Sequence, residues 1–173
     1  PSSPNKPGVE AGCRALLSWA LKDAEVLCNL LEEQEHAKKC RAISKRLKKQ
    51  IKQPNGLKQA AALMSIAGLM KPEQACSEVI SVGGAKDFST FYGYYMLQAL
   101  AQAGEYQQAV DIIRQYWGGM LDLGATTFWE DFNLDWTHNA ARLDDFVPEG
   151  KDDIHGDFGD YCYPSFRHSF CHG

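Results

Sequence analysis

A carboxylate directly after a tryptophan, Glu130 after Trp129, is the arrangement in this sequence best suited to chemistry. Both residues close the segment Gly124–Glu130, which follows a helical run. A glutamate in a cleft accepts a proton from water and acts as a general base when a substrate is bound opposite it. The ring of Trp129 offers a flat apolar face on which a sugar can stack. We therefore predict a site for a sugar or another flat polyol, with Glu130 as the candidate catalytic residue and Trp129 as a candidate substrate contact.

The same residues also have a purely structural interpretation. Glu130 could pair with an arginine such as Arg142, or cap a neighbouring turn. The aromatic side chains around it could fill the core instead of binding a ligand. These side chains are Phe128, Trp129, Phe132 and Trp136. The sequence leaves both interpretations open.

Histidines gather near the end of the chain, beside two cysteines. Imidazole and thiolate are the preferred ligands of zinc, and His168-x-x-Cys171-His172 contains both. The ordered C-x-x-C or H-E-x-x-H spacing of established zinc sites is missing, however. We expect no metal and no cofactor, and favour a histidine that hydrogen-bonds the substrate or the backbone.

Composition excludes several classes of protein. The 173 residues are 45% hydrophobic and 23% charged with a net charge of -4, as in ordinary globular domains. Because no apolar run is long enough to cross a bilayer, we expect no membrane partner. Because the net charge is negative, we also expect no nucleic-acid partner. Basic residues concentrate within 38–52, without interleaved aromatics, and are expected to form a solvated outer face.

Two further features of the sequence are the start of the chain, which bears on its origin, and the six cysteines. Because the first residues contain neither a methionine nor a hydrophobic signal core, we expect a piece cut from a longer protein and leave its compartment unknown. The first four of the six cysteines fall on apolar helix faces, where a free cysteine behaves as a small hydrophobic residue.

The elements that must position the candidate site are helical. Apolar residues recur at helical spacing in six segments, and no β alternation appears. The predicted helices span about 11–32, 35–52, 57–70, 72–82, 88–103 and 105–121. They pair into three hairpins over 11–121, so the fold class is all-α with stacked helical hairpins. Residues 1–10 are expected to be a leader, disordered or left by cloning, and 122–173 a long loop of the kind that carries active sites.

Three of these helices carry informative faces. The first has a core stripe of Cys13, Leu17, Ala20, Ala24, Leu27 and Leu31. The sixth has a stripe of Tyr106, Val110, Ile113, Trp117 and Met120. The third is apolar nearly all round and should be buried on most sides.

Three motifs together resemble a known enzyme family. They are Gly-Ala-Thr-Thr-Phe-Trp-Glu at 124–130, Phe-Tyr-Gly-Tyr-Tyr at 91–95 followed by Ala103-Gly104, and His-Ser-Phe-Cys-His-Gly at 168–173. The chain after its first ten residues is similar to the C-terminal part of the α-L-rhamnosidases, glycoside hydrolase family 78. This resemblance implies half of a catalytic (α/α)6 toroid, a six-hairpin glycosidase fold, and a bacterial parent that is periplasmic or secreted.

The resemblance also implies a mechanism and partners. Family members are inverting enzymes, in which one carboxylic acid protonates the leaving oxygen and a second carboxylate, roughly 6.5 to 9.5 Å away, activates water. By position the base falls on Glu130 and a sugar-contacting histidine on His172, while 132–166 has the length of an insertion. The acid belongs to the missing half, so the fragment should bind carbohydrate but be inactive alone. Its uncovered surface should associate with that half or with itself.

A second interpretation comes from a different class of protein. Ala101-Gln102-Ala103-Gly104-Glu105-Tyr106 followed by Ala109 resembles the helix-turn-helix of tetratricopeptide repeats, which bind other proteins. Those repeats recur about every 34 residues. The hairpins predicted here begin near 11, 57 and 88, so a regular period is absent.

Overall fold

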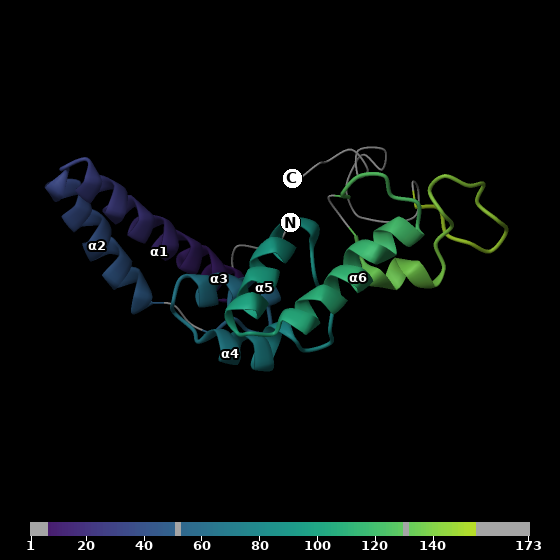
Figure 1. The fold of residues 1–173 in the computed structure, drawn as a ribbon, viewed down its shortest axis with the longest axis horizontal. Helices are drawn as coiled ribbons and strands as arrows, with labels where there is room; N and C mark the ends of the chain where they lie inside the picture. The colour runs from purple at the N-terminus through teal and green to yellow at the C-terminus, as the bar shows by residue number, and fades with distance from the viewer. Residues whose placement is uncertain (1–6, 51–52, 130–131, 155–173) are drawn as a thin grey trace. The chain divides into compact units, whose positions relative to one another are not determined.

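Helices make up the architecture of the part of the chain that the structure describes. The computed structural model describes residues 7–50, 53–129 and 132–154, which contain six α-helices and no β-strand (Figure 1). The all-α fold class is therefore confirmed, whereas the closure of the hairpins into a toroid stays a prediction. The chain divides into two units, one of Pro1–Val82 with Tyr95–Gly104 and one of Gly83–Tyr94 with Glu105–Gly173. Helix α5, Thr90–Gln102, contributes to both.

The first unit begins with a helical hairpin. Helix α1, Pro7–Leu30, packs along α2, Gln34–Lys48, and Glu32 turns the chain with a positive φ of 61°. Between the two helices the hydroxyls of Ser18 and Ser44 lie 3.1 Å apart. The basic side chains of α2 face solvent, as predicted: Lys38, Lys39, Arg41, Lys45, Arg46 and Lys48.

The face that α1 buries is not the predicted one. Its buried residues are all small: Gly8, Ala11, Gly12, Ala15 and Ser18. A Cβ on Gly12 would lie 3.3 Å from Ala60, so the absence of side chains is what lets α1 approach α3 closely. The predicted core stripe instead faces outward, and Cys13 within it is exposed. The prediction was wrong because hydrophobic periodicity follows the large apolar residues, such as leucine, and does not detect the small residues that let two helices pack closely.

Helix α3, Lys58–Ile66, is the centre of the first unit. Lys58 and every residue from Ala60 to Ser65 are buried, which confirms the prediction that this helix is covered on most sides. It ends before the predicted Met70 because Gly68 adopts a positive φ of 69°. Helix α4, Pro72–Ala75, has its proline in the first turn as predicted and continues as a π-helical turn, Cys76–Ile80.

The second unit is built on helix α6, Tyr106–Asp122, and the segments that pack on it. A 3-10 helix, Leu134–His138, lies against α6 within the region predicted to be a loop. Here too most of the buried face is rotated from the predicted one, since Tyr106, Val110 and Ile113 are exposed, although Met120 of the predicted stripe is buried. The buried residues of α6 are Ile112, Tyr116, Gly119 and Met120.

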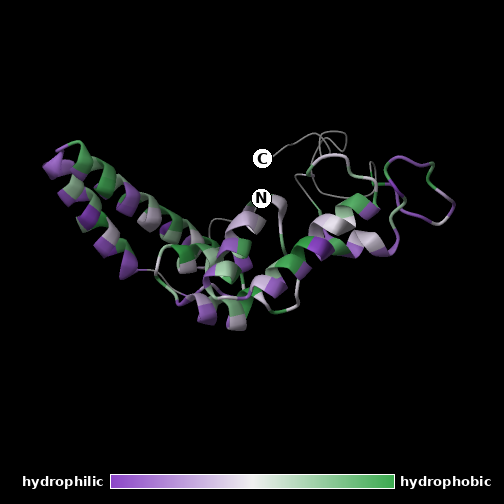
Figure 2. Ribbon diagram, in the orientation of Figure 1, coloured by the Kyte–Doolittle hydropathy of each residue, from purple (hydrophilic) through white to green (hydrophobic). Residues whose placement is uncertain are grey.

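Hydropathy varies along every helix. Apolar and polar residues are interspersed on α1 and α6, and no described helix is long and apolar enough to cross a membrane (Figure 2).

Candidate functional site

The motif that carries the prediction begins where α6 ends. Gly124 has a φ of 90°, and its N–H donates to the carbonyl of Leu121 at 3.0 Å while the N–H of Ala125 donates to Met120 at 2.9 Å. This pair of hydrogen bonds around a left-handed glycine is the Schellman motif that ends many helices. A Cβ at Gly124 would also lie 2.7 Å from a carboxylate oxygen of Asp144. Only glycine therefore fits this turn.

The residues after the turn line a pocket. It has a volume of about 380 Å³ and lies between the last turns of α6 and the start of the motif segment. Its lining residues are Trp117, Met120, Leu121, Ala125, Thr126, Thr127 and Phe128. Phe128 is 45% exposed, so its ring is accessible from solvent. The pocket thus combines accessible apolar surface with two threonine side chains, which suits a ligand with an apolar face and hydroxyl groups.

Trp129 lies in the core of the second unit. Its side chain is 1% exposed, and its ring packs edge-on against Phe132 with centroids 5.8 Å apart. Phe132 in turn packs edge-on against Tyr116 at 5.2 Å and Trp136 at 5.8 Å. This burial agrees with the structural interpretation of the aromatic residues, and the structure offers no free face of Trp129 to a sugar. A contact between Trp129 and substrate stays a prediction.

Glu130 and His172 lie outside the described residues, as do His155, His168 and Cys171 of the predicted histidine cluster. The structure does describe the backbone on both sides of Glu130. The Thr90 hydroxyl donates to the carbonyl of Trp129, and the Tyr116 hydroxyl donates to the carbonyl of Phe132 at 2.9 Å. Both donors are buried. Two hydroxyls, one from α5 and one from α6, therefore anchor the chain just before and just after the predicted base.

Arg142, the arginine that the structural interpretation pairs with Glu130, forms an ion pair with Asp144. Its guanidinium binds both carboxylate oxygens of Asp144, each at 3.0 Å, and donates to the carbonyl of Asp122 at 2.8 Å. The hydrogen bond between the two side chains raises the pKa of Arg142 and lowers the pKa of Asp144. With Leu143 donating to Leu123 at 2.8 Å, this pair ties the later segment to the end of α6.

His138 is the one histidine of the tail that the structure describes, and it lies in the 3-10 helix. Its Nδ1 is 3.0 Å from the carbonyl oxygen of Asp135, a backbone contact of the kind expected for these histidines. In the described part of the chain, no three His, Cys, Asp or Glu side chains come together as metal ligands would.

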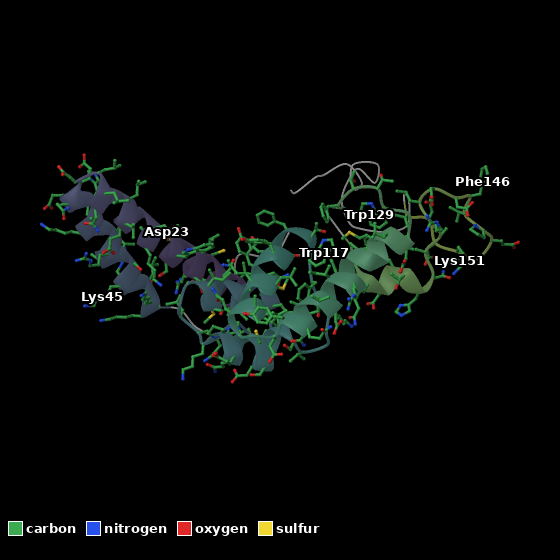
Figure 3. The ribbon with its side chains drawn as sticks, in the orientation of Figure 1. Asp23, Lys45, Trp117, Trp129, Phe146 and Lys151 are labelled. Carbon is green, nitrogen blue, oxygen red and sulfur yellow. The ribbon has the colours of Figure 1, made fainter. Side chains whose placement is uncertain are left out.

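A loop closes beyond the 3-10 helix. The N–H of Ala141 donates to the carbonyl of Asp152 at 2.9 Å, and the Asn139 side chain donates to Gly150 at 3.2 Å. Figure 3 shows Phe146 at the outer end of this loop, where it is 93% exposed. Phe146 is not among the residues that line the pocket.

Comparisons of the chain with protein-family models, with curated proteins and with solved structures gave no match in any of the three.

Proposed function

We propose that this chain is part of an inverting glycoside hydrolase of the α-L-rhamnosidase kind, with Glu130 as its general base. The observation that carries the proposal is the pocket: four of its lining residues, Ala125 to Phe128, are the motif residues that directly precede Trp129 and Glu130. The motif segment therefore borders a space in which a sugar ring can sit.

The pocket lining suits one class of sugar. Phe128 and Trp117 provide aromatic surface, and a deoxy sugar such as rhamnose has a methyl group and an apolar ring face to place against it. Thr126 and Thr127 bring hydroxyls that can donate to and accept from the sugar hydroxyls. A ligand of this kind uses both properties of the lining.

In the proposed reaction, Glu130 takes a proton from water as that water attacks the anomeric carbon. A carboxylic acid on the opposite side of the sugar protonates the departing glycosidic oxygen, and the configuration inverts. We place that acid in the missing half of the parent domain, so the chain alone binds carbohydrate without hydrolysing it.

The tetratricopeptide interpretation finds less support. Its repeats are pairs of helices of similar length, whereas α1 has 24 residues, α3 has 9 and α4 has 4.

The decisive experiment changes Glu130 in the complete parent enzyme. Glu130→Gln removes the base while keeping the size of the side chain, so we expect the kcat for an aryl α-L-rhamnoside to fall about 10²- to 10⁴-fold. Asp131→Asn is the matched control, because it changes the next carboxylate along the chain and should retain most of the activity. Equal losses in the two variants, or full activity of Glu130→Gln, would refute the assignment.

A further inference from the structure

Helix α1 leaves a row of large apolar side chains uncovered. Its small residues pack inside the first unit, and its leucines face away from that contact. The exposed fractions are 48% for Leu17, 56% for Leu27 and 64% for Leu31. Leu16, Val26 and Leu30 are also exposed, at 40%, 59% and 75%, but at about 3.6 residues per turn they lie to one side of this row, and Val26 is on a different face of the helix. Figure 2 shows apolar residues interspersed along α1, and monomeric proteins rarely leave a large apolar surface uncovered.

The spacing of this row specifies the kind of partner. We name the leucine stripe the set Cys13, Leu17, Ala20, Ala24, Leu27 and Leu31. Consecutive members are separated by four, three, four, three and four residues, which is the heptad spacing of two helices that pack side by side. A flat protein surface or a small ligand would not require this spacing. The stripe therefore fits another helix.

The stripe is also symmetric about its midpoint, Lys22. Leu17 and Leu27 lie five residues on either side of Lys22, and Ala20 and Ala24 lie two residues on either side. The Lys22 side chain itself donates to the carbonyl of Ala67, so it is held within the first unit. A stripe with this symmetry is complementary to its own copy when the two helices run antiparallel, which is the condition for a two-fold interface.

We propose that a second copy of this chain covers the leucine stripe, with the two α1 helices antiparallel about a two-fold axis near Lys22. Leu17 of each copy packs against Leu27 of the other, and Cys13 packs against Leu31. Ala20 and Ala24 meet near the axis, where their small side chains let the helices approach closely. This inference concerns the first unit and does not depend on the proposed hydrolase function.

The stripe has the length of an ordinary contact between two helices. From Cys13 to Leu30, where α1 ends, the helix extends roughly 26 Å at 1.5 Å per residue, and Leu31 follows directly. Asp23 is the one charged residue beside the centre of the stripe, and its two copies repel each other across the axis.

Sedimentation equilibrium of the 173-residue chain at tens of micromolar tests the proposal. We expect the wild type to show twice its mass of 19.3 kDa, and Leu17→Glu with Leu27→Glu to raise the dimer Kd by at least about tenfold. Asp23→Asn should lower the Kd because it removes the repulsion. The matched control is Val110→Glu with Ile113→Glu on the exposed face of α6, which should leave the Kd unchanged. Circular dichroism of each variant establishes that its helices are formed.

Cross-linking tests the orientation of the helices. Leu31→Cys places a thiol opposite Cys13 of the other copy, so mild oxidation with a disulfide reagent should join residue 13 to residue 31 between chains, as peptide mass spectrometry would show. A parallel arrangement would instead join Cys13 to Cys13 in the wild type and would overturn the proposal. A wild-type chain that stays monomeric, as expected if another part of the parent covers α1, would also overturn it. So would a dimer that the paired glutamate substitutions leave intact.

Discussion

Thr90 and Tyr116 connect the backbone on either side of the proposed base to helices α5 and α6. Each does so through a single hydrogen bond from its side-chain hydroxyl. Each side-chain hydroxyl donates to one backbone carbonyl, that of Trp129 or that of Phe132, and the predicted base lies between these two acceptors in sequence. Trp129 and Phe132 are themselves buried, so neither carbonyl has ready access to water as a substitute donor. We infer that both hydroxyls are positioning groups for the segment that contains Glu130.

Removing the Tyr116 hydroxyl should destabilise the chain measurably. Tyr116→Phe keeps the packed ring but leaves the buried carbonyl of Phe132 without its donor, which costs about 1 to 3 kcal/mol. Urea unfolding followed by circular dichroism measures the loss. Tyr106→Phe on the same helix is the control, because Tyr106 is exposed and its substitution should change the free energy of unfolding by less than about 0.5 kcal/mol. Equal effects in both variants would mean that the Tyr116 hydrogen bond contributes nothing.

At the scale of elements, glycine decides how α6 packs. Gly118 and Gly119 are neighbours in the same helix, yet a Cβ at Gly118 meets no atom within 4 Å, whereas a Cβ at Gly119 would lie 3.1 Å from the Phe132 ring. That ring is held by Tyr116, Trp129 and Trp136 and has little room to move. A substitution at Gly118 therefore tests only the low helix propensity of glycine, whereas a substitution at Gly119 also tests the close packing against Phe132.

Alanine substitutions at the two positions should have opposite signs. Gly118→Ala should stabilise the chain by about 0.5 to 1 kcal/mol, since alanine lowers the entropic cost of forming the helix. Gly119→Ala should destabilise it by about 1 to 3 kcal/mol, because the added methyl overpacks the Phe132 contact. Thermal unfolding of the two variants gives both signs in one experiment. Stabilisation by Gly119→Ala would show that Phe132 moves aside and that the contact is looser than its geometry indicates.

The elements also show which predictions sequence supports. Helical spacing and turn residues predict six helices, and Pro72 and the buried α3 lie where expected. The predictions of which faces of α1 and α6 are buried were wrong for a common reason. Gly12 and Gly119 lie where another segment approaches the helix backbone closely. A prediction from hydrophobic periodicity does not detect such positions, because glycine contributes little hydrophobicity.

The candidate site was predictable only in part, and again the reason is physical. The motif itself gives the left-handed turn at Gly124 and the residues that line the pocket. Nothing in the sequence distinguishes Phe128, which is accessible, from Trp129, which is buried. Both are large aromatic residues, and only the direction in which the fold points each side chain decides which one is buried. The sequence does not predict the hydrogen bonds of Thr90 and Tyr116 to this segment, because donor and acceptor are 39 and 16 residues apart in the chain.

At the scale of the whole molecule, the two proposals fall on different units. The pocket belongs to the second unit and the leucine stripe to the first, and the two share no residue. Ligand binding and self-association should therefore respond to different substitutions.

A titration of the 173-residue chain with L-rhamnose tests this separation. Trp117 lines the pocket, so its fluorescence should change saturably with sugar, and Phe128→Ala should weaken binding by roughly tenfold or more through loss of the stacking surface. Phe146→Ala is the control, because Phe146 is an exposed aromatic residue away from the pocket. Leu17→Glu with Leu27→Glu should leave the sugar affinity unchanged, and Phe128→Ala should leave the sedimentation mass unchanged. If either set of substitutions altered both measurements, the pocket and the leucine stripe would be coupled, and the assignment of one function to each unit would have to be given up.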